Sequence, residues 1–106
     1  MIAGRAIDKA AELLLEAAPR GSRVILFGSQ ATRTADDRSD VDFLVIEPEV
    51  PNRSREMLRL EQAVRPLKLP VDIVVLSAVA FDRWRGAVNS LAYWAAREGK
   101  VYGPAT

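Results

Sequence analysis

Two aspartates, Asp40 and Asp42, stand two residues apart where a polar stretch gives way to an apolar run. Side chains two apart on a strand point to the same face, so the two carboxylates would project side by side. Carboxylates this close resist joint ionisation unless a cation lies between them. The sequence contains no His and no Cys. The pair therefore predicts a site for a hard, oxygen-seeking cation, Mg²⁺ or Mn²⁺.

A third aspartate, Asp72, interrupts the apolar run 71–76. A charge inside an apolar strand is costly unless it is paired or bound to a metal. If this run neighbours the run 41–46, Asp72 can join Asp40 and Asp42. Three carboxylates are enough to hold two Mg²⁺ ions about 4 Å apart, the arrangement used for in-line phosphoryl and nucleotidyl transfer. A charge that faces water from an edge strand remains the alternative for Asp72.

A glycine and a serine, Gly28 and Ser29, follow the apolar run 24–27. Glycine lets the backbone approach a phosphate closely, and serine adds a hydroxyl and an N–H donor. No Gly-Lys-Ser/Thr sequence follows, which excludes a Walker P-loop. The acidic stretch 36–42 lacks the glycine of a calcium loop and runs straight into a strand, so we also exclude that site. Turn or capping roles remain open for Asp40 or Asp42 taken singly.

Periodic apolar residues predict the elements that position these groups. Helical spacing predicts a helix from Ile7 to Ala18, which Pro19 and the residues after it end. Short β-type runs predict strands over 24–27, 41–46 and 71–76, with a polar loop over 30–39. A second amphipathic helix is predicted over 57–67, bounded by prolines at 66 and 70.

The C-terminal third predicts helices and a short strand. Ser77 is expected to cap the helix that follows the third strand. The last helix is expected over 88–98 with Gly99 as its C-terminal stop, and 101–102 as an edge strand. The aromatic residues of these helices are expected to be mostly core, with a partner-binding patch as the alternative: they are Phe81, Trp84, Tyr93 and Trp94, with Arg83 and Arg85 nearby.

The order of elements predicts an α/β (α+β) domain, with a small mixed β-sheet flanked by helices. The 106 residues are expected to form a single domain over 1–106. A chain this short leaves little room for a separate acceptor-binding domain, so a partner protein or a homo-oligomer is expected.

Charge and hydropathy indicate what the protein binds and where in the cell it is found. The net charge is +1, with 15 basic and 14 acidic residues, so we expect no direct binding of nucleic acid. No apolar run approaches the ~20 residues of a membrane span, and residues 1–18 lack a signal-peptide pattern. We therefore expect a cytoplasmic protein that binds no membrane.

The spacing of these groups resembles a known signature. Gly28-Ser29, a gap of ten residues and then Asp40-Val41-Asp42 resemble the glycine-serine and Asp-x-Asp signature of the polymerase-beta-like nucleotidyltransferase superfamily. The apolar VDFLVI is similar to the strand expected there.

The rest of the chain extends the resemblance. Ser39 is similar to the serine that often precedes the first aspartate, and Asp72 in PVDIVVLS resembles the third catalytic aspartate. The segment SLAYWAAREGKVYG is similar to the C-terminal helix and strand of the minimal nucleotidyltransferase (MNT) family. Thr32 and Arg33 stand where members often carry Arg and Gly. The loss of this glycine is expected to change the loop after Ser29 and the affinity for the triphosphate.

The resemblance implies a nucleotidyltransferase fold and a Mg²⁺-dependent nucleotidyltransferase that moves a nucleoside monophosphate, AMP from ATP, to an acceptor hydroxyl. It implies that Asp40, Asp42 and Asp72 are catalytic and hold two Mg²⁺ ions, with Mn²⁺ as a substitute. Gly28 and Ser29 would bind the β- and γ-phosphates of ATP or another nucleoside triphosphate.

The resemblance also implies a partner, a toxin of the helical HEPN ribonuclease type. The chain would be the antitoxin of a HEPN/MNT pair and would adenylylate its toxin. Two alternatives stay open: an antitoxin that acts by binding alone with a vestigial site, and an antibiotic-type adenylyltransferase with a small-molecule acceptor.

Overall fold

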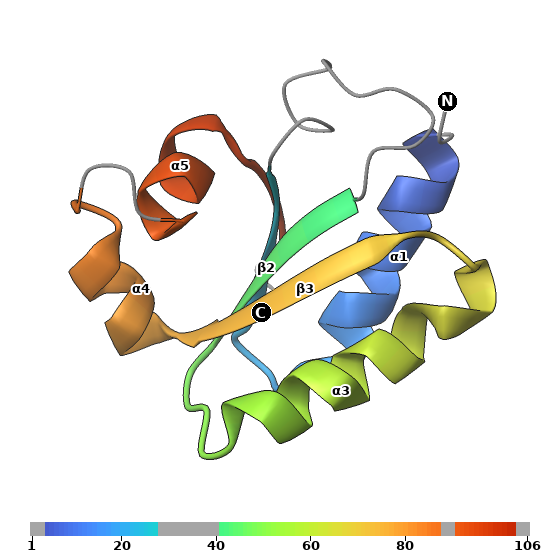
Figure 1. Cartoon of the computed structure of the whole chain (residues 1–106), viewed down its shortest axis with the longest axis horizontal. Coiled ribbons are helices and arrows are strands. Elements are labelled where there is room, and N and C mark those ends of the chain that lie inside the picture. The colour runs from blue at the N-terminus through green and yellow to red at the C-terminus, as the bar shows by residue number, and fades with distance from the viewer. Residues whose placement is uncertain (1–3, 28–40, 88–90, 104–106) are drawn as a thin grey trace.

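The computed structural model describes residues 4–27, 41–87 and 91–103 (Figure 1). In chain order the elements are α1 (Gly4–Ala17), β1 (Arg23–Phe27), β2 (Val41–Glu47), α3 (Arg53–Val64), the 3-10 helix η1 (Arg65–Leu67), β3 (Val71–Ser77), α4 (Ala78–Trp84), α5 (Leu91–Glu98) and β4 (Lys100–Tyr102).

The strands of the described residues form one four-stranded sheet in the order β3-β2-β1-β4. β2 and β3 are parallel, whereas β1 is antiparallel to both β2 and β4. Helices α1 and α3 lie on one side of this sheet, and α4 and α5 lie on the other (Figure 1). The small mixed sheet flanked by helices that the sequence predicts is therefore confirmed.

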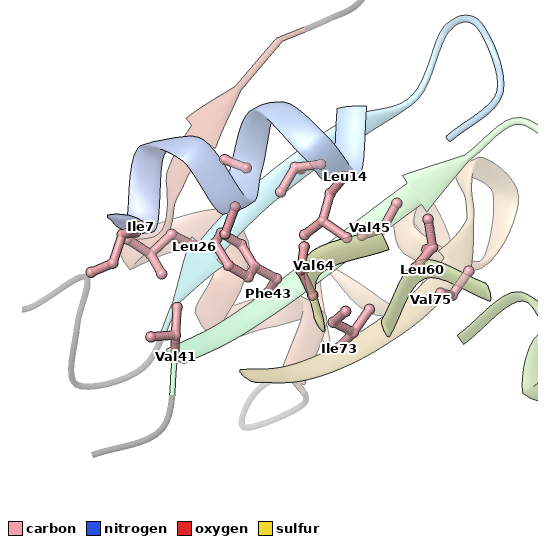
Figure 2. Close-up of a cluster of buried hydrophobic side chains, with 13 residues drawn as sticks. Ile7, Leu14, Leu26, Val41, Phe43, Val45, Leu60, Val64, Ile73 and Val75 are labelled. Atoms are coloured by element: carbon pink, nitrogen blue, oxygen red, sulfur yellow. The ribbon is translucent and has the colours of Figure 1, made fainter. Parts of the chain in front are cut away.

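The larger core lies between the sheet and the pair α1 and α3 (Figure 2). Alternate residues of β2, namely Val41, Phe43 and Val45, point to this side and are fully buried. Leu14 of α1 and Leu60 of α3 pack against them. Period-two alternation on the strands meets helical stripes on the two helices, so this core follows from the apolar pattern.

A second core lies on the other side of the sheet. Leu44 and Ile46, which occupy the opposite phase of β2, pack with Ile25 of β1 and with Phe81 and Ala95 of the C-terminal helices. Both faces of β2 are therefore buried along most of the strand. This explains why its sequence is almost continuously apolar rather than alternating with polar residues.

Local signals place most of the helix ends. The Ser77 Oγ accepts a hydrogen bond from the Ala80 N–H at 3.1 Å, so the predicted cap of α4 is confirmed. The second helix ends three residues earlier than expected, because Pro66 lacks an N–H and the chain tightens into η1. β4 pairs with β1 at the edge of the sheet, as expected. The predicted loop 30–39 and the start of the last predicted helix lie outside the described residues.

The aromatic residues of the C-terminal helices divide between core and surface. Phe81 is buried, as expected of a core residue, whereas Trp84 is 52 % exposed and does not belong to the core. The side chain of Trp94 lies outside what the structure describes. Trp84 is the last residue of the seven-residue α4, so it extends beyond the turn at Phe81 that contacts the sheet. Tyr93 is half-buried. Within the described ranges, no helix is long and apolar enough to cross a bilayer.

Candidate active site

Asp42 and Asp72 are each the second residue of their strand, and the parallel pairing of β2 with β3 aligns them directly. Residues aligned on neighbouring strands point to the same face, and neighbouring strands lie roughly 4.8 Å apart. The fold therefore brings together two carboxylates that are 30 positions apart in the sequence. Asp42 is half-buried and Asp72 is exposed.

The apolar alternation directs both carboxylates away from the larger core. Val41 and Phe43 point toward α1 and α3, so Asp42 between them points to the opposite face. A backbone hydrogen bond of 2.7 Å from the Val41 N–H to the Pro70 carbonyl continues the pairing at this end. A slip of one residue would turn Asp72 into the larger core, so burial of its apolar neighbours fixes the register.

The position of Asp72 is relevant to both interpretations made from the sequence. β3 is at the edge of the described sheet, so an exposed charge on it fits the edge-strand alternative. An edge charge needs no second carboxylate in register, however. Like charges aligned on adjacent strands are destabilising, which leaves the alignment with Asp42 unexplained by edge protection.

The C-terminal end of β1 lies beside the end of β2 that carries Asp42. Phe27, its last residue, is aligned with Asp42 in the antiparallel pairing. The sequence continues from Phe27 into the predicted phosphate-binding residues Gly28 and Ser29. These two residues lie outside the described part of the chain, as do Asp40, Thr32 and Arg33: their predicted roles stay predictions.

Two of the three predicted metal ligands are thus adjacent. Within residues 4–27, 41–87 and 91–103, no three acidic, His or Cys residues surround a common point, and Asp40 lies outside these ranges. The adjacent pair offers oxygen donors alone, which suits Mg²⁺. Asp42 and Asp72 therefore fit a magnesium ion by their donor type and by their alignment.

A buried acidic group that the sequence analysis missed lies at the other end of β2. Glu47 is 2 % exposed, and burial raises its pKa to about 8. A hydrogen bond links it to Glu56 of α3, whose pKa is held low first by Arg59 and then by Glu47. The signal was present in the sequence, because Glu47 continues the buried phase of Val41, Phe43 and Val45.

The chain is similar to known proteins in both sequence and structure. The family model described as "Nucleotidyltransferase domain" matches residues 7–93, a range that includes both Asp42 and Asp72. One chain of a crystal structure of a toxin-antitoxin with AMP-PNP is similar at 26 % sequence identity and a TM-score of 0.59. The similarity covers 93 % of the present chain and 72 % of that chain. No curated protein sequence matches.

Proposed function

Because the chain belongs to the nucleotidyltransferase domain family, we propose that it transfers AMP from ATP to an acceptor hydroxyl in a Mg²⁺-dependent reaction. The observation that carries this proposal is the alignment of Asp42 with Asp72 near the start of their two strands. A divalent cation that binds between two adjacent carboxylates offsets their like charge.

Each acidic residue has a part in the proposed reaction. Asp40, Asp42 and Asp72 would hold Mg²⁺. When bound, the metal neutralises triphosphate charge and lowers the pKa of a coordinated hydroxyl. Asp72, exposed on an edge strand, can be reached by an acceptor and can accept the hydroxyl proton. A bond forms between the acceptor oxygen and the α-phosphorus as the bond to pyrophosphate breaks. Gly28 and Ser29 would orient the β- and γ-phosphates.

We assign the acceptor to a partner toxin of the HEPN type, which makes the chain an antitoxin that adenylylates its toxin in the cytoplasm. The similar solved chain comes from a toxin-antitoxin structure that contains AMP-PNP, an analogue of ATP, which supports a toxin as the partner and ATP as the nucleotide. Inhibition of the toxin by binding alone is the second candidate. It is favoured by the Thr32-Arg33 departure in the stretch after Ser29.

Labelling of the partner tests the transfer. ATP labelled at the α-phosphate is mixed with Mg²⁺, this protein and, as the candidate partner, the product of the adjacent gene. We expect label on the partner, reduced about a hundredfold or more by Asp42→Asn, since a lost metal contact costs several kcal/mol in the transition state. Asp82→Asn changes an exposed carboxylate on α4 and serves as the matched control.

The outcomes separate the two candidates. Label that persists undiminished in Asp42→Asn would rule out the proposed site. A partner that is inhibited equally by the parent and by Asp42→Asn, without label in either case, identifies an antitoxin that acts by binding alone. A labelled small hydroxyl compound in place of the protein would identify the antibiotic-type acceptor.

A further inference from the structure

Glu47 is the last residue of β2, at the opposite end of this strand from Asp42. It is among the most deeply buried side chains of the described residues. Its Oε2 has no hydrogen-bond partner among the described residues. An ionised carboxylate in this position would leave an oxygen charged and without a donor, which is far more costly than leaving a neutral acid there. Burial therefore favours the protonated form of Glu47.

The partner of Glu47 is suited to a protonated acid. Glu56, in the first turn of α3, is hydrogen-bonded to Glu47, and it accepts two further bonds from Arg59, at 2.8 Å from Nε and 2.6 Å from Nη2. The forked contact with the guanidinium keeps Glu56 ionised. A carboxylate cannot donate, so the hydrogen between the two acids must come from Glu47.

Four charged side chains line the same cavity as Glu47. The connection from β2 to α3 contributes Glu49, and α3 contributes Arg55 along with the Glu56–Arg59 pair. These residues line a cavity of about 310 Å³ at the start of α3. The segment before β1 contributes Pro19 to this cavity. If the antiparallel pairing of β1 with β2 is continued by one residue, Ser22 lies opposite Glu47. Like Pro19, Ser22 is uncharged.

We propose that Glu47 is buried as a neutral acid that donates a hydrogen bond to Glu56, and that this bond forms a pH-sensitive link between the end of β2 and the first turn of α3. The proton links two elements of the larger core. When Glu47 loses this proton, its carboxylate is in contact with the carboxylate of Glu56 in the first turn of α3. Another contact that supports this turn is the Asn52 cap. The link is separate from the Asp42–Asp72 pair and does not depend on the proposed transfer reaction.

The direction of the pH effect follows from linkage. Burial raises the pKa of Glu47 from 4.5 to about 8, so the folded protein binds this proton more tightly than the unfolded chain does. The stabilisation is complete below pH 4.5, decreases as the pH rises, and is lost above about 8. The lowered pKa of Glu56 acts in the opposite direction, but only below pH 4.5. The sequence has no His to titrate between these limits.

Thermal unfolding from pH 5 to pH 8.5 tests the link. We expect the Tm of the parent to fall by at least about 5 °C across this range. Glu47→Gln replaces the acid by an amide that can still donate to Glu56 but cannot lose a proton. Its Tm should be nearly independent of pH and should exceed that of the parent at pH 8.5. Glu49→Gln, a neighbouring glutamate on the same cavity, is the control and should follow the parent.

A parallel decline of Glu47→Gln and the parent would overturn the proposal, as would a flat curve for the parent. Should Glu47→Gln fail to fold, carboxyl-carbon NMR of the parent decides. One glutamate signal must titrate near pH 8, and its absence rejects the neutral acid.

Hydrogen exchange locates the effect. Protection of the Arg55 and Glu56 amides, both bonded to Asn52, should fall with rising pH by more than that of the Arg85 amide, which is bonded to Phe81. Equal changes at the two places would show that no link to α3 exists.

Discussion

Asp42 and Asp72 are aligned on adjacent parallel strands, so their side chains point to the same face of the sheet. Their neighbours Val41 and Ile73 are buried in the larger core, which fixes the register of the two strands and keeps this alignment. A divalent cation bound between two carboxylates offsets their like charge. Loss of either carboxylate should therefore weaken the binding of the metal.

Replacing one of the two carboxylates should separate the stability of the fold from the binding of the metal. We expect Asp72→Asn to change the Tm of the metal-free protein little, because this side chain is exposed. Mg²⁺ with ATP should raise the Tm of the parent, since a ligand at about 100 times its Kd stabilises by roughly 2.7 kcal/mol. Most of that rise should be absent in Asp72→Asn. The measurement is differential scanning fluorimetry with and without Mg²⁺-ATP.

The control for this measurement is Asp82→Asn, which should keep the full ligand-induced rise. A full rise in Asp72→Asn would remove Asp72 from the nucleotide site and would favour the edge-strand interpretation of its charge. A large loss of Tm in the metal-free variant would indicate instead a structural role for the carboxylate.

At the scale of elements, Gly99 lies close against β1 where α5 ends. A Cβ on Gly99 would overlap the Ile25 side chain and lie 2.5 Å from the carbonyl oxygen of Ala95. The sequence predicted Gly99 as a helix stop, yet the structure requires glycine there because of crowding. The Gly99 N–H also donates to that Ala95 carbonyl at 3.0 Å, which continues the helical hydrogen-bond pattern of α5 as far as Gly99.

We expect Gly99→Ala to lower the free energy of unfolding by about 1–3 kcal/mol, the usual cost of overpacking. Gly86→Ala is the matched control, because a Cβ at that position would meet no atom within 4 Å. Chemical denaturation of the two variants measures the difference. Equal stability of Gly99→Ala and Gly86→Ala would contradict the close approach of α5 to β1.

At the scale of the whole molecule, a small chain has buried cores on both sides of one sheet. β2 contributes to both, with Phe43 toward α1 and α3 and with Leu44 toward the C-terminal helices. Domains of this size have a total stability of about 5–15 kcal/mol. The loss of one large side chain from the larger core is therefore a substantial part of the whole.

Phe43→Ala should remove about 3–5 kcal/mol, because a fully buried ring leaves a cavity that the sheet cannot close. The measurement is the urea midpoint, with the slope unchanged if unfolding stays two-state. Leu58→Ala, at a side chain that is 52 % exposed on α3, should change stability by no more than about 0.5 kcal/mol. Similar losses in both variants would place Phe43 outside the core.

The sequence by itself determined the order and type of the described strands and α-helices, with ends that differ by up to four residues. Alternation within a few residues is enough to distinguish a strand such as 71–76 from a helix, and Ser77 caps α4 through a contact three residues away. Residue types also determined the donor chemistry, since a chain without His or Cys offers oxygen ligands. Such signals act over a short stretch of chain, so they can be read without the fold.

Only the tertiary structure decided which strands are neighbours and in what register. The alignment of Asp42 with Asp72 joins strands separated by a helix, and no local pattern selects that pairing. The neutral form of Glu47 and the crowding at Gly99 likewise depend on atoms from distant parts of the chain. Desolvation and close packing are sums over non-local contacts, which a sequence pattern implies but does not locate.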